Sequence, residues 1–300
     1  MTFDPGQKAA GADGMPFVFG VSEFTTMPWS FEQDIEHYAE LGITAIELCE
    51  QKLDDGRYAA QVGSIAASGL QICAVQPLVR TFLASRMAPE PRAMTDRVAR
   101  MRTSIERLAP FAPEAPFIVN TGAHPRGDMD DAMRVVGREL KELAVIAADH
   151  SIRIALEPLN PTSVNIESAI WTVDQALSVI ESTGCDEIGL CLDYWNVWQD
   201  AEVETAIGRA GDRIFYVQAS DWRTPRSFAD RIVPGKGIIP LGRLMRATYD
   251  AGYRGPCVVE IFSSDVADSL YTQNLDEVIV QSRAGLNAAW IGSENIGKVR

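Results

Sequence analysis

Four polar side chains follow four apolar segments in the second half of the chain, and their types are those that catalysis or metal binding uses. They are Glu157 in IALEPLN, Asp193 in GLCLDYWN, Gln218 in FYVQASD and Glu260 in CVVEIFS. Each segment is a short run rich in Val, Ile, Leu or Phe, which is typical of a strand buried on both faces. A carboxylate in such a place is costly to remove from water unless another charge compensates it. Four such residues on separate strands indicate a site for a divalent cation.

These four side chains form an all-oxygen ligand set made of three carboxylates and one amide. Hard oxygen ligands suit Mg²⁺ or Mn²⁺, whereas thiolates and imidazoles favour zinc. We therefore expect Glu157, Asp193, Gln218 and Glu260 to hold one divalent metal ion, Mn²⁺ or Mg²⁺. The alternative is that they are polar residues of a strand core, each paired with an arginine or a lysine.

The elements that must position these residues alternate along the chain between strand and helix patterns. Strand patterns cover residues 17–24, 44–50, 71–78, 116–123, 154–159, 189–195, 215–220 and 258–262. Helix patterns cover residues 31–41, 59–68, 94–108, 130–148, 166–182, 202–209, 241–251 and 275–291. Strands that alternate with helices pair in parallel through right-handed crossovers.

About eight such units predict an α/β fold, a single-domain (β/α)₈ TIM barrel, which typically takes roughly 250 residues. We expect it to span residues 16–300, after a disordered N-terminal tail over residues 1–15 that is polar and rich in Gly and Ala. The alternative is an open doubly wound sheet, but no G-x-G-x-x-G follows the first strand pattern. In a barrel, the carboxyl ends of the strands share one mouth, so the four polar residues would lie on one arc of it.

Composition limits the classes of partner. The formal net charge is −14, which disfavours binding to nucleic acid or to anionic membranes. No apolar run is long enough to span a bilayer, and the N-terminus does not resemble a signal peptide. The five cysteines lack C-x-x-C spacing and are expected to be reduced. We expect a cytoplasmic protein with a small-molecule substrate.

Several strings carry a family resemblance: LEPLN, LDYWN, VQASD followed by DRIVPGKG, and VVEIF. They resemble the xylose isomerase-like sugar phosphate isomerase/epimerase family, over most of the chain from GVSEF to the last strand pattern. The resemblance implies that Glu157, Asp193 and Glu260 are ligands of one divalent metal. Gln218 takes the place of the usual histidine in V-H-x-x-D, and the family's dehydroshikimate dehydratase branch is similar in having glutamine there.

The resemblance also implies a reaction. A bound cation makes the C–H next to a carbonyl more acidic by stabilising an enediolate. One carboxylate takes this proton and a second one on the opposite face returns it, which interconverts epimers or an aldose and a ketose. Glu157 and Glu260 are the expected catalytic pair of such an isomerase or epimerase of a small sugar. The alternative is a lyase, a dehydratase of a keto-polyol such as dehydroshikimate, in which water leaves the same carbanion.

Five further residues are candidates for binding the substrate. His124 follows the fourth strand pattern, Gln76 ends the third, and Trp29 follows the first, where it would form an apolar wall. Asn196 takes a position at which related epimerases often have histidine. Arg231 matches the family's arginine before P-G-x-G, and its guanidinium suits hydroxyl or carboxylate groups.

Two other classes of function compete with these enzymes. DNA-repair nucleases of the endonuclease IV type share the fold, but their three-zinc site needs many histidines, and this chain has three. A non-catalytic sugar-binding or scaffold protein is the second alternative, because a fold does not fix a function. Family members are often dimers or tetramers, so a homo-oligomer is a further expectation.

Overall fold

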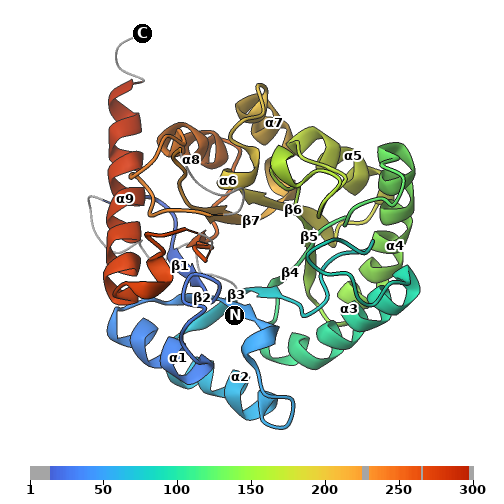
Figure 1. The fold of residues 1–300 in the computed structure, drawn as a ribbon, viewed down its shortest axis with the longest axis horizontal. Helices are drawn as coiled ribbons and strands as arrows, with labels where there is room; N and C mark the ends of the chain where they lie inside the picture. The colour runs from blue at the N-terminus through green and yellow to red at the C-terminus, as the bar shows by residue number, and fades with distance from the viewer. Residues whose placement is uncertain (1–13, 225–229, 265, 297–300) are drawn as a thin grey trace.

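Eight parallel strands close into a barrel in the computed structural model, which describes residues 14–224, 230–264 and 266–296 (Figure 1). Each strand pairs with the next one along the chain, and β1 pairs with β8. The strands are β1 Phe19–Ser22, β2 Ala45–Cys49, β3 Gln71–Gln76, β4 Pro116–Val119, β5 Arg153–Leu156, β6 Ile188–Asp193, β7 Ile214–Ala219 and β8 Cys257–Val259. The predicted (β/α)₈ barrel is confirmed, and the open sheet is ruled out.

Helices surround this barrel on its outer side (Figure 1). They are α1 Phe31–Glu40, α2 Tyr58–Ala67, α3 Met94–Leu108, α4 Met129–Asp149, α5 Val173–Thr183, α6 Tyr194–Val197, α7 Val203–Ala210, α8 Leu241–Asp250 and α9 Leu275–Ile296. Short 3₁₀ turns cover Glu50–Lys52, Ala109–Phe111, Pro161–Ser163, Gly211–Arg213 and Leu270–Thr272. The Ser30 side chain accepts a hydrogen bond from the Gln33 backbone N–H at the start of α1, and the Gln33 side chain accepts one from the Ser30 backbone N–H, which together form a capping box.

A small set of side chains forms a packed layer inside the barrel. This cluster contains Ala45, Cys73, Ala74, Ile118, Ala155, Cys191, Tyr216 and Val258. Successive residues of a strand point to opposite faces, so the residue two places further along points to the same side. The apolar layer therefore lies directly beneath whatever the strands carry two residues later, at the carboxyl end of the barrel.

One predicted helix begins later than its sequence pattern suggested. The pattern favoured a helix over residues 166–182, but α5 begins at Val173. Thr172 caps it, because its side chain accepts a hydrogen bond from the Gln175 backbone N–H. The preceding segment is a loop in which Val164 and Ser168 form an isolated bridge and Asn165 has a positive φ of 63°. Ala169 and Ile170 are buried within this loop, so their apolar character reflected burial rather than a helical stripe.

The predicted disordered tail over residues 1–15 falls largely outside the described residues. Of its described part, Met15 is buried, and its backbone N–H donates to Asn287 Oδ1 at 3.1 Å. Among the described helices, none combines the length and the apolar character that crossing a membrane would require.

Candidate functional site

A ring of eight polar side chains lies at the carboxyl ends of the strands. Each of them follows an inward-facing residue of its strand by two places. Alternate residues of a strand share a face, so all eight side chains face the barrel interior. All eight are buried, although seven of them have charged or amide side chains. In strand order, they are Ser22, Glu47, Gln76, Asn120, Glu157, Asp193, Gln218 and Glu260. The four predicted metal ligands are the last four members of this ring.

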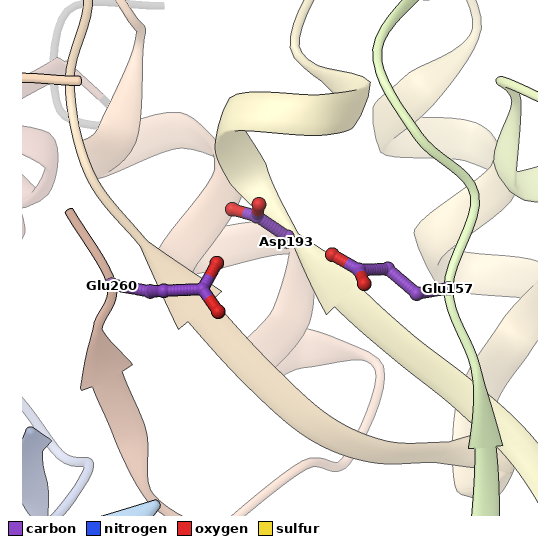
Figure 2. A group of neighbouring side chains, drawn as sticks. All are labelled: Glu157, Asp193 and Glu260. Atoms are coloured by element: carbon purple, nitrogen blue, oxygen red, sulfur yellow. The ribbon is translucent and has the colours of Figure 1, made fainter. Parts of the chain in front are cut away.

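Three of these carboxylates converge on one point. Glu157 follows β5, Asp193 ends β6 and Glu260 follows β8, and Figure 2 shows their carboxyl groups pointing toward one another. One oxygen from each lies within 4.8 Å of an oxygen of the other two. Oxygens that ligate one ion at about 2.0–2.6 Å are separated by distances of this order. The structure thus brings together the three carboxylates among the four predicted ligands.

Two asparagines hold the Glu157 carboxylate in place. Asn120 Nδ2 donates to Glu157 Oε2 at 2.9 Å. Asn196 Nδ2 donates to Glu157 Oε1 at 2.8 Å and to Asp193 Oδ2 at 2.8 Å, so it links two of the converging carboxylates. Asn196 is itself fixed, because its Oδ1 accepts from the Asn160 backbone N–H at 2.9 Å. The predicted substrate residue Asn196 therefore positions the carboxylates as well as lining the site.

Arg231 supplies a positive charge next to the carboxylates of Asp193 and Glu260. Its Nη1 lies 2.9 Å from Asp193 Oδ2 and 2.7 Å from Glu260 Oε2. The guanidinium is stacked between Trp195 and Phe262, whose ring centroids are 4.8 and 5.0 Å away. Aromatic faces on both sides restrict the guanidinium to this place and stabilise it by cation–π attraction.

Gln218 is in contact with the carboxylates through its amide nitrogen. Its Nε2 donates to Glu260 Oε1 at 2.9 Å and to Glu47 Oε2 at 2.8 Å. Its Oε1 accepts from Cys191 Sγ at 3.2 Å, in the layer beneath. In this arrangement Gln218 bridges two carboxylates, and a role as an oxygen ligand requires the amide to turn over. Its assignment as a metal ligand remains a prediction.

Glu47 is a member of the ring that the sequence did not single out. It is fully buried in β2, and it accepts hydrogen bonds from Ser22 Oγ at 2.6 Å and Gln76 Nε2 at 3.2 Å, besides the one from Gln218. Gln76 also approaches Glu260 Oε1 at 3.4 Å. The signal was present: Glu47 is an acidic residue two places after Ala45 in an otherwise apolar strand pattern.

Burial dominates the titration of these acids. Desolvation, followed by the charge of Asp193, raises the pKa of Glu157 to about 7, although Asn120 and Arg231 act in the opposite direction. Desolvation raises the pKa of Glu260 well above its usual value, against the attraction of Arg231. The pKa of Asp193 is raised for the same reason. The site is therefore short of positive charge.

The donor set fits a divalent cation. Glu157, Asp193 and Glu260 carry three negative charges when they are deprotonated. Within the described ranges, Arg231 is the one residue that forms salt bridges with this group. Gln76 Oε1 is a further buried acceptor that has no hydrogen-bond partner among the described residues. A dication bound by the three carboxylates would offset the excess negative charge, and oxygen ligands of this kind suit Mg²⁺ or Mn²⁺.

A cavity of about 260 Å³ opens above the ring. Phe24, Trp195 and Phe262 give it aromatic walls, and Glu157 and Glu260 are part of its lining. Gln76, Asn196 and Arg231, three of the predicted substrate residues, also line it. Its volume suits a small molecule of about sugar size, and its walls and polar floor suit a molecule with both C–H faces and hydroxyl groups.

The other two predicted substrate residues are not among the described residues that line this cavity. His124 Nε2 lies 3.1 Å from Asp131 Oδ2, and His124 Nδ1 accepts from the backbone N–H of Asp128 at 3.1 Å. The His124 imidazole thus stabilises the start of α4. Trp29 stacks on His37 with ring centroids 4.2 Å apart. Roles for His124 and Trp29 in binding the substrate remain predictions, and this structure does not bring either side chain to the site.

Several known proteins are similar to this chain in sequence, at low identity. The D-psicose 3-epimerase of Enterocloster bolteae is 28% identical over 133 residues, which are 44% of this chain and 40% of that protein. The 3-dehydroshikimate dehydratase of Pseudomonas aeruginosa is 26% identical over 244 residues, which are 77% of this chain and 36% of that protein. The matched region is therefore less than half the length of either relative.

A solved structure and a family model cover far more of the chain. A crystal structure of a Sinorhizobium meliloti protein superposes with a TM-score of 0.80 at 23% identity, covering 91% of this chain and 98% of that one. At this identity the superposition supports the fold alone. The family model described as xylose isomerase-like TIM barrel matches residues 35–288. The chain therefore belongs to the xylose isomerase-like TIM barrel family.

Proposed function

We propose that this protein is a metal-dependent isomerase or epimerase that moves a proton next to the carbonyl of a small sugar. The observation that carries this proposal is the convergence of Glu157, Asp193 and Glu260, with one oxygen of each within 4.8 Å of the others, at the floor of the cavity. Sugar epimerases and isomerases are among the relatives, at low identity.

Glu157, Asp193 and Glu260 would hold the ion, with Gln218 as the fourth expected ligand. A divalent ion bound there supplies positive charge that makes the C–H beside a substrate carbonyl more acidic. Manganese or magnesium is the ion we propose, because the ligands are oxygens.

The proton transfer itself belongs to Glu157 and Glu260, which approach the cavity floor from β5 and β8. One carboxylate removes the proton from one face of the substrate, and the other delivers a proton to the opposite face. Asn120 and Asn196 orient Glu157, whereas Arg231 and Gln218 orient Glu260. Each base therefore has two donors that fix its direction, and the aromatic walls hold the sugar between them.

A dehydratase of a keto-polyol is the second candidate. Gln218 favours it, because the resemblance places glutamine at this position in the dehydroshikimate dehydratase branch. The 3-dehydroshikimate dehydratase of Pseudomonas aeruginosa also matches 77% of this chain, more than the D-psicose 3-epimerase does. The same base would remove the proton, and a β-hydroxyl would leave as water instead of a proton returning.

One experiment separates these activities. The protein, loaded with Mn²⁺ or Mg²⁺, is incubated in D₂O with D-psicose, D-fructose, an inosose and 3-dehydroshikimate. Isomerisation or epimerisation gives a product of unchanged composition that has gained deuterium beside the carbonyl. Elimination gives a product lighter by one water, with a new ultraviolet chromophore. If neither deuterium nor a chromophore appears with any substrate and metal, proton transfer at this site is refuted for these substrates.

We also propose that the protein works in the cytoplasm on a small molecule. Four of its cysteines are buried and all five are free in the structure, which fits a reducing compartment. Size-exclusion chromatography with light scattering tests the expected homo-oligomer, and a monomeric mass at micromolar concentration would contradict it.

A further inference from the structure

Two guanidinium groups line the cavity, and they differ in their partners. Arg231 is occupied by Asp193 and Glu260. Arg80 is half-buried in the lining, and its guanidinium lies 5.2 Å from the centroid of the Phe24 ring. Among the described residues, no carboxylate lies within ion-pair distance of Arg80 and no acceptor is hydrogen-bonded to its guanidinium. The Arg80 charge acts on Glu157 through space and opposes the rise of that acid's pKa, but the N–H groups of its guanidinium are available to a ligand in the cavity.

Arg80 is held at a fixed place relative to the proposed base. Its carbonyl oxygen accepts a hydrogen bond from the Asn120 backbone N–H at 2.7 Å. The side chain of the same Asn120 donates to Glu157 Oε2 at 2.9 Å. One residue thus connects the backbone that carries the free guanidinium to the carboxylate that would take the proton.

A second arginine, Arg97, holds the loop that carries Arg80 through hydrogen bonds to its backbone. Arg97 is fully buried on α3, and its Nε donates to the Thr81 carbonyl oxygen at 2.5 Å. Its Nη1 donates to the Pro91 carbonyl oxygen at 2.8 Å, and its Nη2 donates to Thr81 Oγ1. A loop tied at both ends in this way presents its side chains with little freedom, which lowers the entropy cost of binding.

We propose that Arg80 selects substrates that carry an anionic oxygen group, a carboxylate or a phosphate, close to the reacting carbon. A guanidinium donates two parallel hydrogen bonds to such a group, and its stacking on Phe24 leaves the edge of the fork free to do so. Glu167 also lines the cavity, on the loop after β5. Its carboxylate repels an anion there, so the anionic group points toward the loop after β3 and the neutral part of the substrate points toward Glu167.

This inference deepens the proposed function by naming the class of substrate, and it is tested by equilibrium binding without turnover. The ligands are two matched pairs that differ mainly in charge: quinate with its methyl ester, and D-fructose 6-phosphate with D-fructose. Isothermal titration calorimetry on the Mn²⁺-loaded protein gives a dissociation constant for each. The first pair tests a carboxylate and the second tests a phosphate.

Two substitutions isolate the guanidinium. Arg80→Met keeps an apolar stem against Phe24 and removes the charge, whereas Arg80→Lys keeps the charge and removes the fork. Arg86→Met is the matched control, because Arg86 is an exposed arginine of the same loop that does not line the cavity. Circular dichroism and the thermal midpoint establish that each variant is folded.

We expect at least one anionic ligand to bind about 10- to 100-fold more tightly than its neutral partner, the scale of a charge-assisted hydrogen bond. In Arg80→Met this preference falls to about 1, with little change for the neutral ligand, and in Arg80→Lys it is intermediate. Absence of a preference in both wild-type pairs, an undiminished preference in Arg80→Met, or an equal loss in Arg86→Met would each overturn the inference. Binding of this kind without any turnover would instead count against the proposed reaction alone.

Discussion

Asn196 bridges Glu157 and Asp193 by donating a 2.8 Å hydrogen bond from its Nδ2 to each carboxylate. An amide nitrogen has two N–H groups, and both are used here to hold two acids of neighbouring strands at a separation that one ion can span. Asn196 lies on the short helix α6, which Asp193 caps by accepting from the Trp195 backbone N–H at 3.0 Å. The turn after β6 therefore positions a ligand and its supporting donor together.

The first prediction concerns this bridge. Asn196→Ala removes the donor that aligns two ligands, so we expect the affinity for Mn²⁺ to fall about 10- to 100-fold, as for other groups that orient metal ligands. Calorimetric titration of the metal-free protein with Mn²⁺ measures it. Asn274→Ala at the start of α9 serves as the control, because Asn274 is not among the described residues that line the cavity. Unchanged affinity in Asn196→Ala would show that the bridge does not orient the ligands.

The second prediction concerns the proposed proton-transfer pair. Glu157→Gln and Glu260→Gln keep the shape of each side chain and remove its ability to accept a proton, so turnover should fall at least about 100-fold in each. Burial already disfavours the charged form of both acids, so the amides should leave the thermal midpoint unchanged or higher. Steady-state kinetics and thermal unfolding test the two parts. A near-normal rate in both variants would refute the assigned roles.

Gln218 is the subject of the third prediction. Gln218→His places an imidazole next to Glu260, so the site should still bind a divalent ion but shift its preference from Mg²⁺ toward Zn²⁺ or Co²⁺. Titration of the variant and the wild type with these three ions gives the preference directly. If the affinities for all three are the same in both proteins, Gln218 is not a ligand, and its bridge between Glu47 and Glu260 is its whole role.

The chain order of strands and helices made the barrel predictable. Once the barrel was expected, Glu157, Asp193 and Glu260 could be placed at one mouth, because the carboxyl ends of its strands meet there. Glu47 and Asn120 obey the same alternation, two residues after Ala45 and Ile118, and they were overlooked for different reasons. Glu47 stands in the middle of the strand pattern over residues 44–50 and not at its end, and Asn120 is an uncharged residue just after its strand.

The side chains that spacing could not place belong to loops. His124 follows β4, but its ring turns to Asp131 and the start of α4 instead of the cavity. Arg80 follows β3 and faces the cavity, although nothing in its spacing distinguished it from other loop arginines. The backbone geometry of a strand makes its side chains alternate between two faces. The direction of a loop side chain depends instead on contacts with residues elsewhere in the chain, such as the hydrogen bond from Arg97 to Thr81.

The fourth prediction is a pH dependence of stability that arises outside the metal site. Asp34 is fully buried on α1, 2.5 Å from Lys52 Nζ and 2.6 Å from Thr26 Oγ1, and Glu23 is close by. Desolvation raises the pKa of Asp34 from 3.8 to about 6, in spite of Lys52. The folded protein therefore binds more protons than the unfolded chain between these values, and the contribution of Asp34 to stability falls as pH rises through this window.

Asp34→Asn tests this contribution, because the amide cannot titrate. The unfolding free energy of each protein is measured in urea between pH 4 and pH 7. The wild-type value minus the variant value should decrease by roughly 2 to 3 kcal/mol across this range, from the size of the pKa shift. Using the difference removes the contribution of carboxylates that do not interact with Asp34. The contribution of Glu23 remains in it, because Asp34 helps to raise the pKa of Glu23. A difference that stays constant with pH would contradict the raised pKa of Asp34.

The fifth prediction is that a divalent ion stabilises the folded protein through the three converging carboxylates. An ion that binds only the folded state adds about 2.7 kcal/mol to the unfolding free energy at a concentration of 100 times its dissociation constant. Asp193→Asn should lose most of this gain, because it weakens the ligand that Asn196 and Arg231 orient. Asp55→Asn changes the net charge equally at an exposed residue and should keep the gain. Urea unfolding with and without Mn²⁺ measures all three proteins, and an equal gain in Asp193→Asn and Asp55→Asn would place the stabilising ion elsewhere.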